Sequence, residues 1–450
     1  MREKTTTPVI YTNNNNRAGT IIAAVFKKHM YSLTDTASLE PLLQDMNDRR
    51  IVMLGEASHG THEYYTWRAA VSKKLIQEKG CRFIAVEGDW PDCYRINRYV
   101  KGYADAGDNI RDILESFDRW PTWMWANWEI AALAEWLREH NRHLPVNQKV
   151  GFYGLDVYSL WDSMHAMMHY LEKEDPRAAR YVKQAIACFE PFNEDERLYA
   201  RFSLNDHSCR DAVLSLLKEV RMKAQFLDSD PEAALNTEQN ALIAVNAESY
   251  YRSMIGFDNN SWNIRDRHMM DTLDRLLLFH GHGSKGIVWE HNTHIGDARA
   301  TDMARAGMVN IGQLARDMYG KENVYLAGFA SYEGTVIAGS EWGAPMQEME
   351  VPPAREQSIE AVLHQHAVHP GNDCYILFSE DKDALYRSRI PHRAIGVVYD
   401  PDMERAGNYV PSVLAERYDA LIYLDQTSAL HPLHMHPQDE KLPETYPSGM

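Results

Sequence analysis

The sequence predicts an α/β protein, with a mostly parallel sheet flanked by helices and a large helical insertion that forms a cap. Short apolar runs recur along most of the chain, and segments of helical period separate the early runs. Continuous apolar runs are typical of strands buried on both faces, and their alternation with helices indicates an α/β fold. The expected strands are residues 51–54, 83–86, 150–153, 286–289, 324–327, 375–378, 395–398 and 420–424.

The helical part of the prediction has two sources. Residues 67–79 (WRAAVSKKLIQEK) place apolar side chains at helical spacing. Residues 160–282 form a long, charged, helix-favouring stretch without a convincing strand, broken by prolines, and we expect it to be inserted between two strands of one sheet. Residues 350–354 (EVPPA) are interpreted as a loop.

We divide the chain into a flexible arm (residues 1–20), a single domain (residues 21–435) and an irregular tail (residues 436–450). The first residues contain no apolar segment of the kind found in signal peptides, and no run of 18 apolar residues occurs. We therefore expect a cytoplasmic protein with no membrane partner.

Composition limits the possible partners. The 450 residues are 44% hydrophobic, which allows a sizeable core, and the formal net charge is −17. Nucleic acid is not expected as a partner, because binding phosphates requires clustered lysine and arginine. A small-molecule substrate that is neutral or cationic is favoured. The sequence does not set the oligomeric state.

Cysteines are few and scattered. The five are Cys81, Cys93, Cys188, Cys209 and Cys374, and no CxxC pair occurs among them. An odd, sparse set of this kind predicts free thiols in a reducing compartment.

Carboxylate and imidazole side chains, which can act as acids, bases or ligands, follow four of the predicted strands. Glu56, His59 and Glu63 follow residues 51–54, Glu87 and Asp89 follow 83–86, Asp156 follows 150–153, and Glu290, His291 and His294 follow 286–289. In open α/β sheets, ligands bind outside the carboxyl ends of the strands. The sequence therefore predicts one crevice lined by carboxylates and imidazoles.

These residue types suit general acid–base chemistry. A histidine such as His59 can take a proton from water, and Glu56 can orient it or stabilise its charged form. Glu87 ends an apolar run, so burial would raise its pKa unless a cation such as Arg68 lies near. His291 and His294 are three residues apart and could stabilise an oxyanion or bind a metal ion.

Other patterns are discounted. Residues 281–286 match GxGxxG but precede a strand, whereas a dinucleotide-binding loop follows one. No Walker A motif and no GxSxG nucleophile elbow occurs, so a serine hydrolase is not expected. The aromatic stretch 120–128 is assigned to packing, with some rings lining an apolar pocket. His62, His431, His434 and His436 are interpreted as structural or solvated.

Four segments resemble the erythromycin esterase family, including its large uncharacterised branch. They are residues 54–68 (LGEASHGTHEYYTWR), 86–100 (VEGDWPDCYRINRYV), 289–298 (WEHNTHIGDA) and 425–433 (DQTSALHPL). The resemblance covers roughly residues 40 to 435 in order. It implies an α/β core with helical additions, hydrolysis of a macrolide lactone of the kind that confers antibiotic resistance, and a histidine base in place of a serine nucleophile.

The resemblance also implies particular roles. His59 corresponds to the general base and Glu56 to its carboxylate partner, while the other matching catalytic positions are Arg68, Glu87, His291 and His294. Four further acidic residues beside these positions are taken as candidates for substrate binding: Glu63, Asp89, Asp156 and Glu290. No cofactor is expected.

Three hypotheses follow. The first is a metal-independent hydrolase that cleaves an ester or lactone with water activated by His59. The second is a metal-dependent hydrolase, because Glu56, His59, Glu87, His291 and His294 are ligand types that suit Zn²⁺ or Mn²⁺. The third is a protein that binds a small apolar molecule under the cap without turning it over.

Overall fold

The computed structural model describes residues 29–192, 196–203, 208–223, 230–254, 260–366, 372–378 and 388–434. The expected N-terminal arm and the tail after residue 435 lie outside the described residues. No helix within the described ranges is long and apolar enough to cross a membrane.

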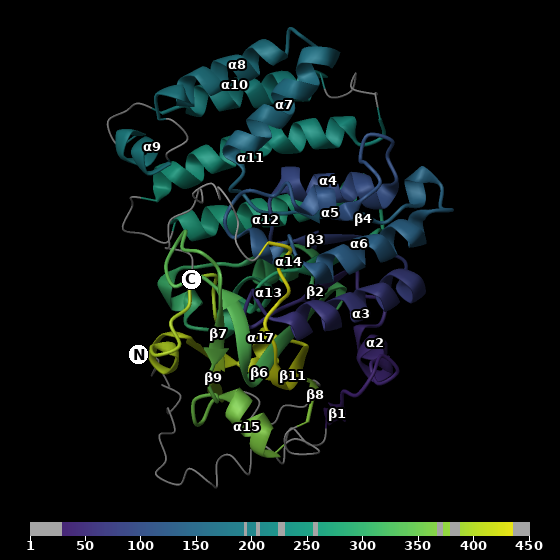
Figure 1. The fold of residues 1–450 in the computed structure, drawn as a ribbon, viewed down its shortest axis with the longest axis vertical. Coiled ribbons are helices and arrows are strands. Elements are labelled where there is room, and N and C mark those ends of the chain that lie inside the picture. The colour runs from purple at the N-terminus through teal and green to yellow at the C-terminus, as the bar shows by residue number, and fades with distance from the viewer. Residues whose placement is uncertain are drawn as a thin grey trace, which may run out of the picture.

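A nine-stranded sheet runs through the molecule (Figure 1). Its order is β1 (Met30–Ser32), β8 (Cys374–Leu377), β11 (Ala420–Thr427), β6 (Val324–Ala338), β2 (Ile51–Leu54), β5 (Lys285–Trp289), β3 (Cys81–Val86) and β4 (Gly151–Gly154), and β7 (Gln347–Val351) pairs with β6. The six strands from β11 to β4 are mutually parallel, whereas β1, β7 and β8 pair antiparallel. The predicted α/β class with a mostly parallel sheet is confirmed.

Both faces of the sheet are buried. In β2, Val52 and Leu54 pack into one apolar core, and Ile51 and Met53 pack into another. Side chains of α2 (Glu40–Met46), α3 (His62–Lys79), α5 (Ile110–Leu114) and α6 (Trp128–Asn141) complete the first core, while α12 (Asn260–Phe279), α14 (Ile311–Tyr319) and α15 (Ile359–His366) contribute to the second. This double burial explains why the strands have continuous apolar sequences.

Helices fill the interval between β4 and β5. They are α7 (Leu160–Glu174), α8 (Ala179–Phe189), α9 (Glu196–Ser203), α10 (Arg210–Lys223), α11 (Ala233–Ser253) and α12. Helices α7 to α11 gather at one end of the molecule, at the top of Figure 1. They enclose an apolar core of their own, with Met164, Val182 and Leu216 among its buried members. Helix α12 instead packs Met269, Leu273 and Leu276 on the sheet.

One local prediction is wrong and another is correct only in part. Residues 395–398 do not form a strand, because only isolated bridges join Ile395 to Ser58 and Val398 to Gly339. The apolar side chains of this run instead pack against β6 and line a cavity. The neighbouring ladder is formed by β9 (Arg389–Arg393) and β10 (Tyr409–Val413). Of the stretch interpreted as a loop at 350–354, the first two residues belong to β7, which pairs with β6, and residues 352–354 lie outside any strand.

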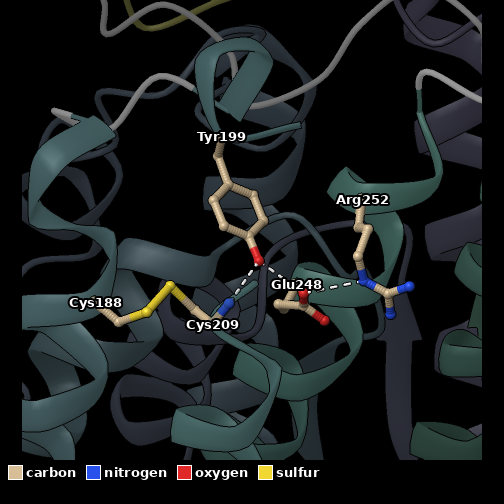
Figure 2. The surroundings of a disulfide bond; sticks show 5 residues. All are labelled: Cys188, Tyr199, Cys209, Glu248 and Arg252. Carbon is tan, nitrogen blue, oxygen red and sulfur yellow. Dashed lines mark hydrogen bonds and ion pairs between the residues drawn. A yellow bond between two sulfur atoms is a disulfide. The ribbon is translucent and has the colours of Figure 1, made fainter. Parts of the chain in front are cut away.

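The expectation that every cysteine is a free thiol is also wrong. Cys188 and Cys209 form a disulfide between the end of α8 and the start of α10 (Figure 2), with their Cα atoms 5.8 Å apart. The backbone N–H of Cys209 also donates to the hydroxyl of Tyr199, on α9. The fold of the intervening residues brings the two cysteines together, and spacing alone cannot reveal this. Cys81, Cys93 and Cys374 are free and buried.

Four further α-helices lie in the described chain. They are α4 (Trp90–Lys101), α13 (Asn292–Ile295), α16 (Glu404–Gly407) and α17 (Leu414–Arg417). Helix α4 follows β3 and α13 follows β5, so both begin at the carboxyl edge of the sheet. The polar residues that precede these helices therefore lie at that edge.

Candidate active site

Four adjacent strands, β2, β5, β3 and β4, end at the same edge of the sheet, and the predicted polar residues follow them. A cavity of about 340 Å³ lies there. Six of the predicted residues line this cavity: His59, Glu87, Asp89, Asp156, His291 and His294. The parallel register of the strands is the reason that residues far apart in sequence share one site.

His59 sits in the loop between β2 and α3. Its Nδ1 lies 3.0 Å from Oε1 of Glu56, and Nη2 of Arg68 donates to Oε2 of Glu56 at 2.6 Å. A carboxylate beside Nδ1 favours the tautomer that carries its proton there, which leaves Nε2 as the basic nitrogen. Gly60 holds the loop close to β6, since a Cβ atom at this position would lie 1.9 Å from the carbonyl oxygen of Ile337.

The charge around His59 favours its protonated form. Burial disfavours the imidazolium, but the carboxylates of Glu87 and Glu56 outweigh this effect, and the pKa of His59 is raised above its ordinary value of 6.5. A base with a pKa near the working pH can both accept a proton from water and return it to a leaving group.

Glu87 is buried and ionised. Its Oε1 accepts from Nη2 of Arg265 at 2.7 Å, and its Oε2 accepts from the backbone N–H of His291 at 2.8 Å. Burial works against the charged carboxylate, yet Arg265, His59 and the backbone N–H of His291 lower the pKa of Glu87 well below its usual range. The cation beside Glu87 is thus Arg265, where the sequence had suggested Arg68.

Arg265 comes from α12 and connects three side chains. Besides Glu87, it binds both carboxylate oxygens of Asp156, with Nε at 3.0 Å and Nη2 at 2.7 Å. Its Nη1 donates to Nε2 of His294 at 3.0 Å. Paired carboxylates hold the guanidinium in a fixed plane. No sequence motif marked this arginine.

Both ring nitrogens of His294 are engaged. Nε2 accepts from Arg265, and Nδ1 donates to Asp266 at 3.0 Å. The ring also stacks on Trp262, with the ring centroids 4.5 Å apart. Its Nε2 therefore acts here as an acceptor fixed by a buried arginine. Asp266, like Arg265, comes from α12 and carried no signal in the sequence.

His291 offers a free donor. Its Nδ1 accepts from the backbone N–H of Thr293, so the ring proton lies on Nε2. That buried Nε2 has no hydrogen-bond partner among the described residues. The pKa of His291 is lowered well below 6.5, chiefly by burial and by His59, whose ring centroid is 4.9 Å away. A neutral imidazole N–H next to the candidate base is suited to binding an oxyanion.

Other predicted residues lie outside the cavity. Glu63 binds the backbone N–H and the hydroxyl of Ser428, and Arg68 is fully buried against the rings of Tyr65 and Trp289. Glu290 is fully buried, and neither carboxylate oxygen has a hydrogen-bond partner in the described part of the chain.

Burial and the nearby Glu87 raise the pKa of Glu290, so its neutral form is favoured. A neutral, enclosed carboxyl group does not attract a charged substrate. Of the four residues considered for substrate binding, Asp89 and Asp156 are thus the two on the cavity wall. Asp89 is paired with Arg119 and Asp156 with Arg265.

Aromatic side chains form much of the remaining wall. Phe117, Trp120, Trp125 and Trp342 line the cavity, together with residues that flank the β9–β10 ladder, among them Val397. The prediction that some rings of residues 120–128 line an apolar pocket is confirmed by Trp120 and Trp125. The contribution of Trp342 and of residues 394–410 depends on long-range folding and was not predicted.

The five candidate metal ligands do not form a metal site in this conformation. Among the described residues, no three of Glu56, His59, Glu87, His291 and His294 bring their donor atoms together within reach of one ion. Arg265 contacts both Glu87 and His294, and its fixed positive charge disfavours a cation there.

The fold and site together define an α/β protein whose buried histidine–carboxylate pair lies at an aromatic-lined cavity on the carboxyl edge of the sheet. Residues 76–427 match the family model described as erythromycin esterase. The chain belongs to the erythromycin esterase family and is a hydrolase of that family.

Two curated proteins are similar over most of their length. Erythromycin esterase type II of Escherichia coli is 22% identical over 349 residues, which are 72% of this chain and 80% of that protein. The putative hydrolase YbfO of Bacillus subtilis (strain 168) is 22% identical over 401 residues, or 84% of each chain.

Solved structures share the fold. A succinoglycan biosynthesis protein superposes with a TM-score of 0.71 at 18% identity, covering 92% of this chain and 98% of that one. A mutant of the erythromycin esterase EreC in its open conformation gives a TM-score of 0.64 at 17% identity, covering 91% and 100%. At these identities the likeness concerns the fold alone.

Proposed function

We propose that this protein hydrolyses a carboxylic ester or lactone with water activated by His59. The observation that carries the proposal is the pairing of two buried imidazoles with opposite roles. His59 has Nδ1 held by Glu56, and His291 presents an unpaired Nε2–H beside it. One ring supplies a base and the other supplies a donor for negative charge.

The reaction balances with these groups alone. Nε2 of His59 takes a proton from water as the oxygen attacks the substrate carbonyl, and the carbonyl oxygen becomes an oxyanion that accepts from His291. When the C–O bond to the alcohol breaks, the protonated His59 gives its proton to the departing alkoxide. The products are a carboxylic acid and an alcohol, which remain in one molecule when the substrate is a lactone.

Glu87 supports this cycle through charge. Its carboxylate lies within electrostatic reach of His59 and favours the imidazolium that forms during attack. Arg265 in turn keeps Glu87 ionised and in place. In this proposal Arg265, Asp156 and His294 position Glu87, and Glu56 and Arg68 position His59.

The cavity supports a largely apolar, neutral substrate. Its wall carries three tryptophans and Phe117, and its acidic groups Asp89 and Asp156 are paired with Arg119 and Arg265. About 340 Å³ is at the small end of the range for small-molecule sites. Macrolide lactones, the substrates suggested by the family, therefore belong in a test panel with smaller lactones and simple esters.

The experiment is mass spectrometry of such a panel after incubation with purified protein. We expect at least one member to gain one water with the wild type and with His143→Gln, an exposed histidine outside the cavity. The His59→Gln variant is expected to leave the same compound intact. Full turnover by His59→Gln would contradict the proposed base, and tight binding without turnover by the wild type would favour the binding-protein hypothesis.

A further inference from the structure

A second cluster of ligand-type side chains lies outside the cavity. His62 is the first residue of α3, Glu129 is in the first turn of α6, and His431 follows β11. One donor atom from each of the three lies within 4.8 Å of the others. None of the three lines the active-site cavity.

The two carboxylate oxygens of Glu129 differ in their hydrogen bonding. Nδ1 of His62 lies 2.5 Å from Oε1 of Glu129, and Nδ1 of His431 lies 2.6 Å from the same oxygen. The other oxygen, Oε2, is buried and has no hydrogen-bond partner among the described residues. The Glu129 side chain is 5% exposed, so this carboxylate is held in the interior and aimed at two imidazoles.

We propose that His62, Glu129 and His431 form a binding site for a divalent transition metal ion, with Zn²⁺ as the best-suited ion. Two imidazole nitrogens and one carboxylate are a donor set that zinc accepts in tetrahedral geometry, with water as the fourth ligand. The ion replaces the protons between the two Nδ1 atoms and Glu129, and each imidazole then remains neutral with its proton on Nε2.

Exposure and charge both suit metal entry. His431 is 59% exposed on its side chain and His62 is 32% exposed, which gives the ion a path from solvent and room for a water ligand. Glu63 adds a further negative charge near His62. The cluster thus combines a buried carboxylate with two partly exposed imidazoles and a nearby acidic residue.

The backbone already holds the three segments together. The N–H of His62 donates to the carbonyl of Ser428, the N–H of Leu430 donates to Gly60, and the N–H of Trp128 donates to His431. An ion bound by His431 and His62 therefore links the chain after β11 to the end of the loop that carries His59. The geometry assigns the ion a structural role, apart from the reaction.

The test uses full-length protein purified without a histidine tag, with Zn²⁺ as zinc chloride. We expect one zinc per wild-type chain by metal analysis, a higher Tm on adding zinc, and intense tetrahedral absorption when Co²⁺ is substituted. His431→Gln, on an exposed side chain, is expected to weaken zinc binding by roughly tenfold or more. Circular dichroism checks that each variant folds. Glu129→Gln is the second variant and is also expected to weaken zinc binding.

Two matched controls locate the ion. His143→Gln alters an exposed histidine outside the cluster, and His59→Gln alters the active site, so both are expected to bind zinc as the wild type does. Absence of zinc binding by the wild type would overturn the proposal, as would unchanged binding by both His431→Gln and Glu129→Gln. Loss of the ion with His59→Gln alone would place it in the active site and would overturn the proposal as well.

Discussion

Arg265 on helix α12 donates to Glu87 at the end of β3, with 2.7 Å between Nη2 and Oε1. This contact joins the last helix of the insertion to the strand edge that carries the site. The same guanidinium binds Asp156 after β4. The segment between β4 and β5 therefore supplies the central cation of the site.

Removing this cation should be costly. Arg265→Ala leaves Glu87 and Asp156 buried without their partner, and we expect the free energy of unfolding to fall by about 3–5 kcal/mol. Urea unfolding measures the change. Arg142→Ala, which breaks an exposed pair with Glu139, is the control and should change stability by about 0.5 kcal/mol. Equal effects of the two variants would rule out a central role for Arg265.

The second prediction concerns Glu56. Glu56→Gln keeps the size of the side chain but removes the charge that holds His59 and compensates Arg68. We expect kcat to fall about 100-fold or more, since general-base catalysis contributes roughly this much. Steady-state kinetics on a substrate identified in the panel checks this. A variant with wild-type kcat would show that Glu56 does not orient the base.

His291 is predicted to act on the transition state. Because its Nε2–H has no partner in the described structure, His291→Ala removes a donor that only the developing oxyanion uses. We expect kcat to fall about 10²- to 10³-fold with little change in KM. An increase in KM at constant kcat would instead assign His291 to substrate binding.

The disulfide is predicted to stabilise the group of helices α7 to α11. It joins residues 21 apart, and closing a loop of this size stabilises a fold by about 3 kcal/mol through the entropy of the unfolded chain. Replacing both Cys188 and Cys209 with serine should therefore increase hydrogen exchange in α8 and α10. Exchange in β2 and β3, within the sheet, is the internal reference. Unaltered exchange in α8 and α10 would show that packing alone holds these helices in place.

Local sequence predicted the strands that carry the site. The runs at β2, β3 and β5 are continuously apolar because both faces are buried, and their ends point to Glu56, Glu87 and His291 without knowledge of the fold. A pattern of this kind depends only on near neighbours in sequence, so it can be detected in one chain.

Long-range partners could not be predicted in this way. Arg265 and Asp266 are two charged residues in a long helix, and nothing local separates them from solvent-facing neighbours. The cluster of His62, Glu129 and His431 combines three distant segments. The run at 395–398 has the composition of a strand but packs as a loop beside the cavity, because β9 and β10 form the adjacent ladder.

The pH dependence of kcat/KM tests the central claim most directly. His59 must be neutral to accept a proton, and its pKa is raised, so activity should fall as the pH drops through a midpoint above 6.5. Glu56→Gln removes one of the carboxylates that raise this pKa, so the account predicts a midpoint at lower pH in the variant. An identical midpoint in both proteins, or no acidic limb in the wild type, would contradict His59 as the base held by Glu56.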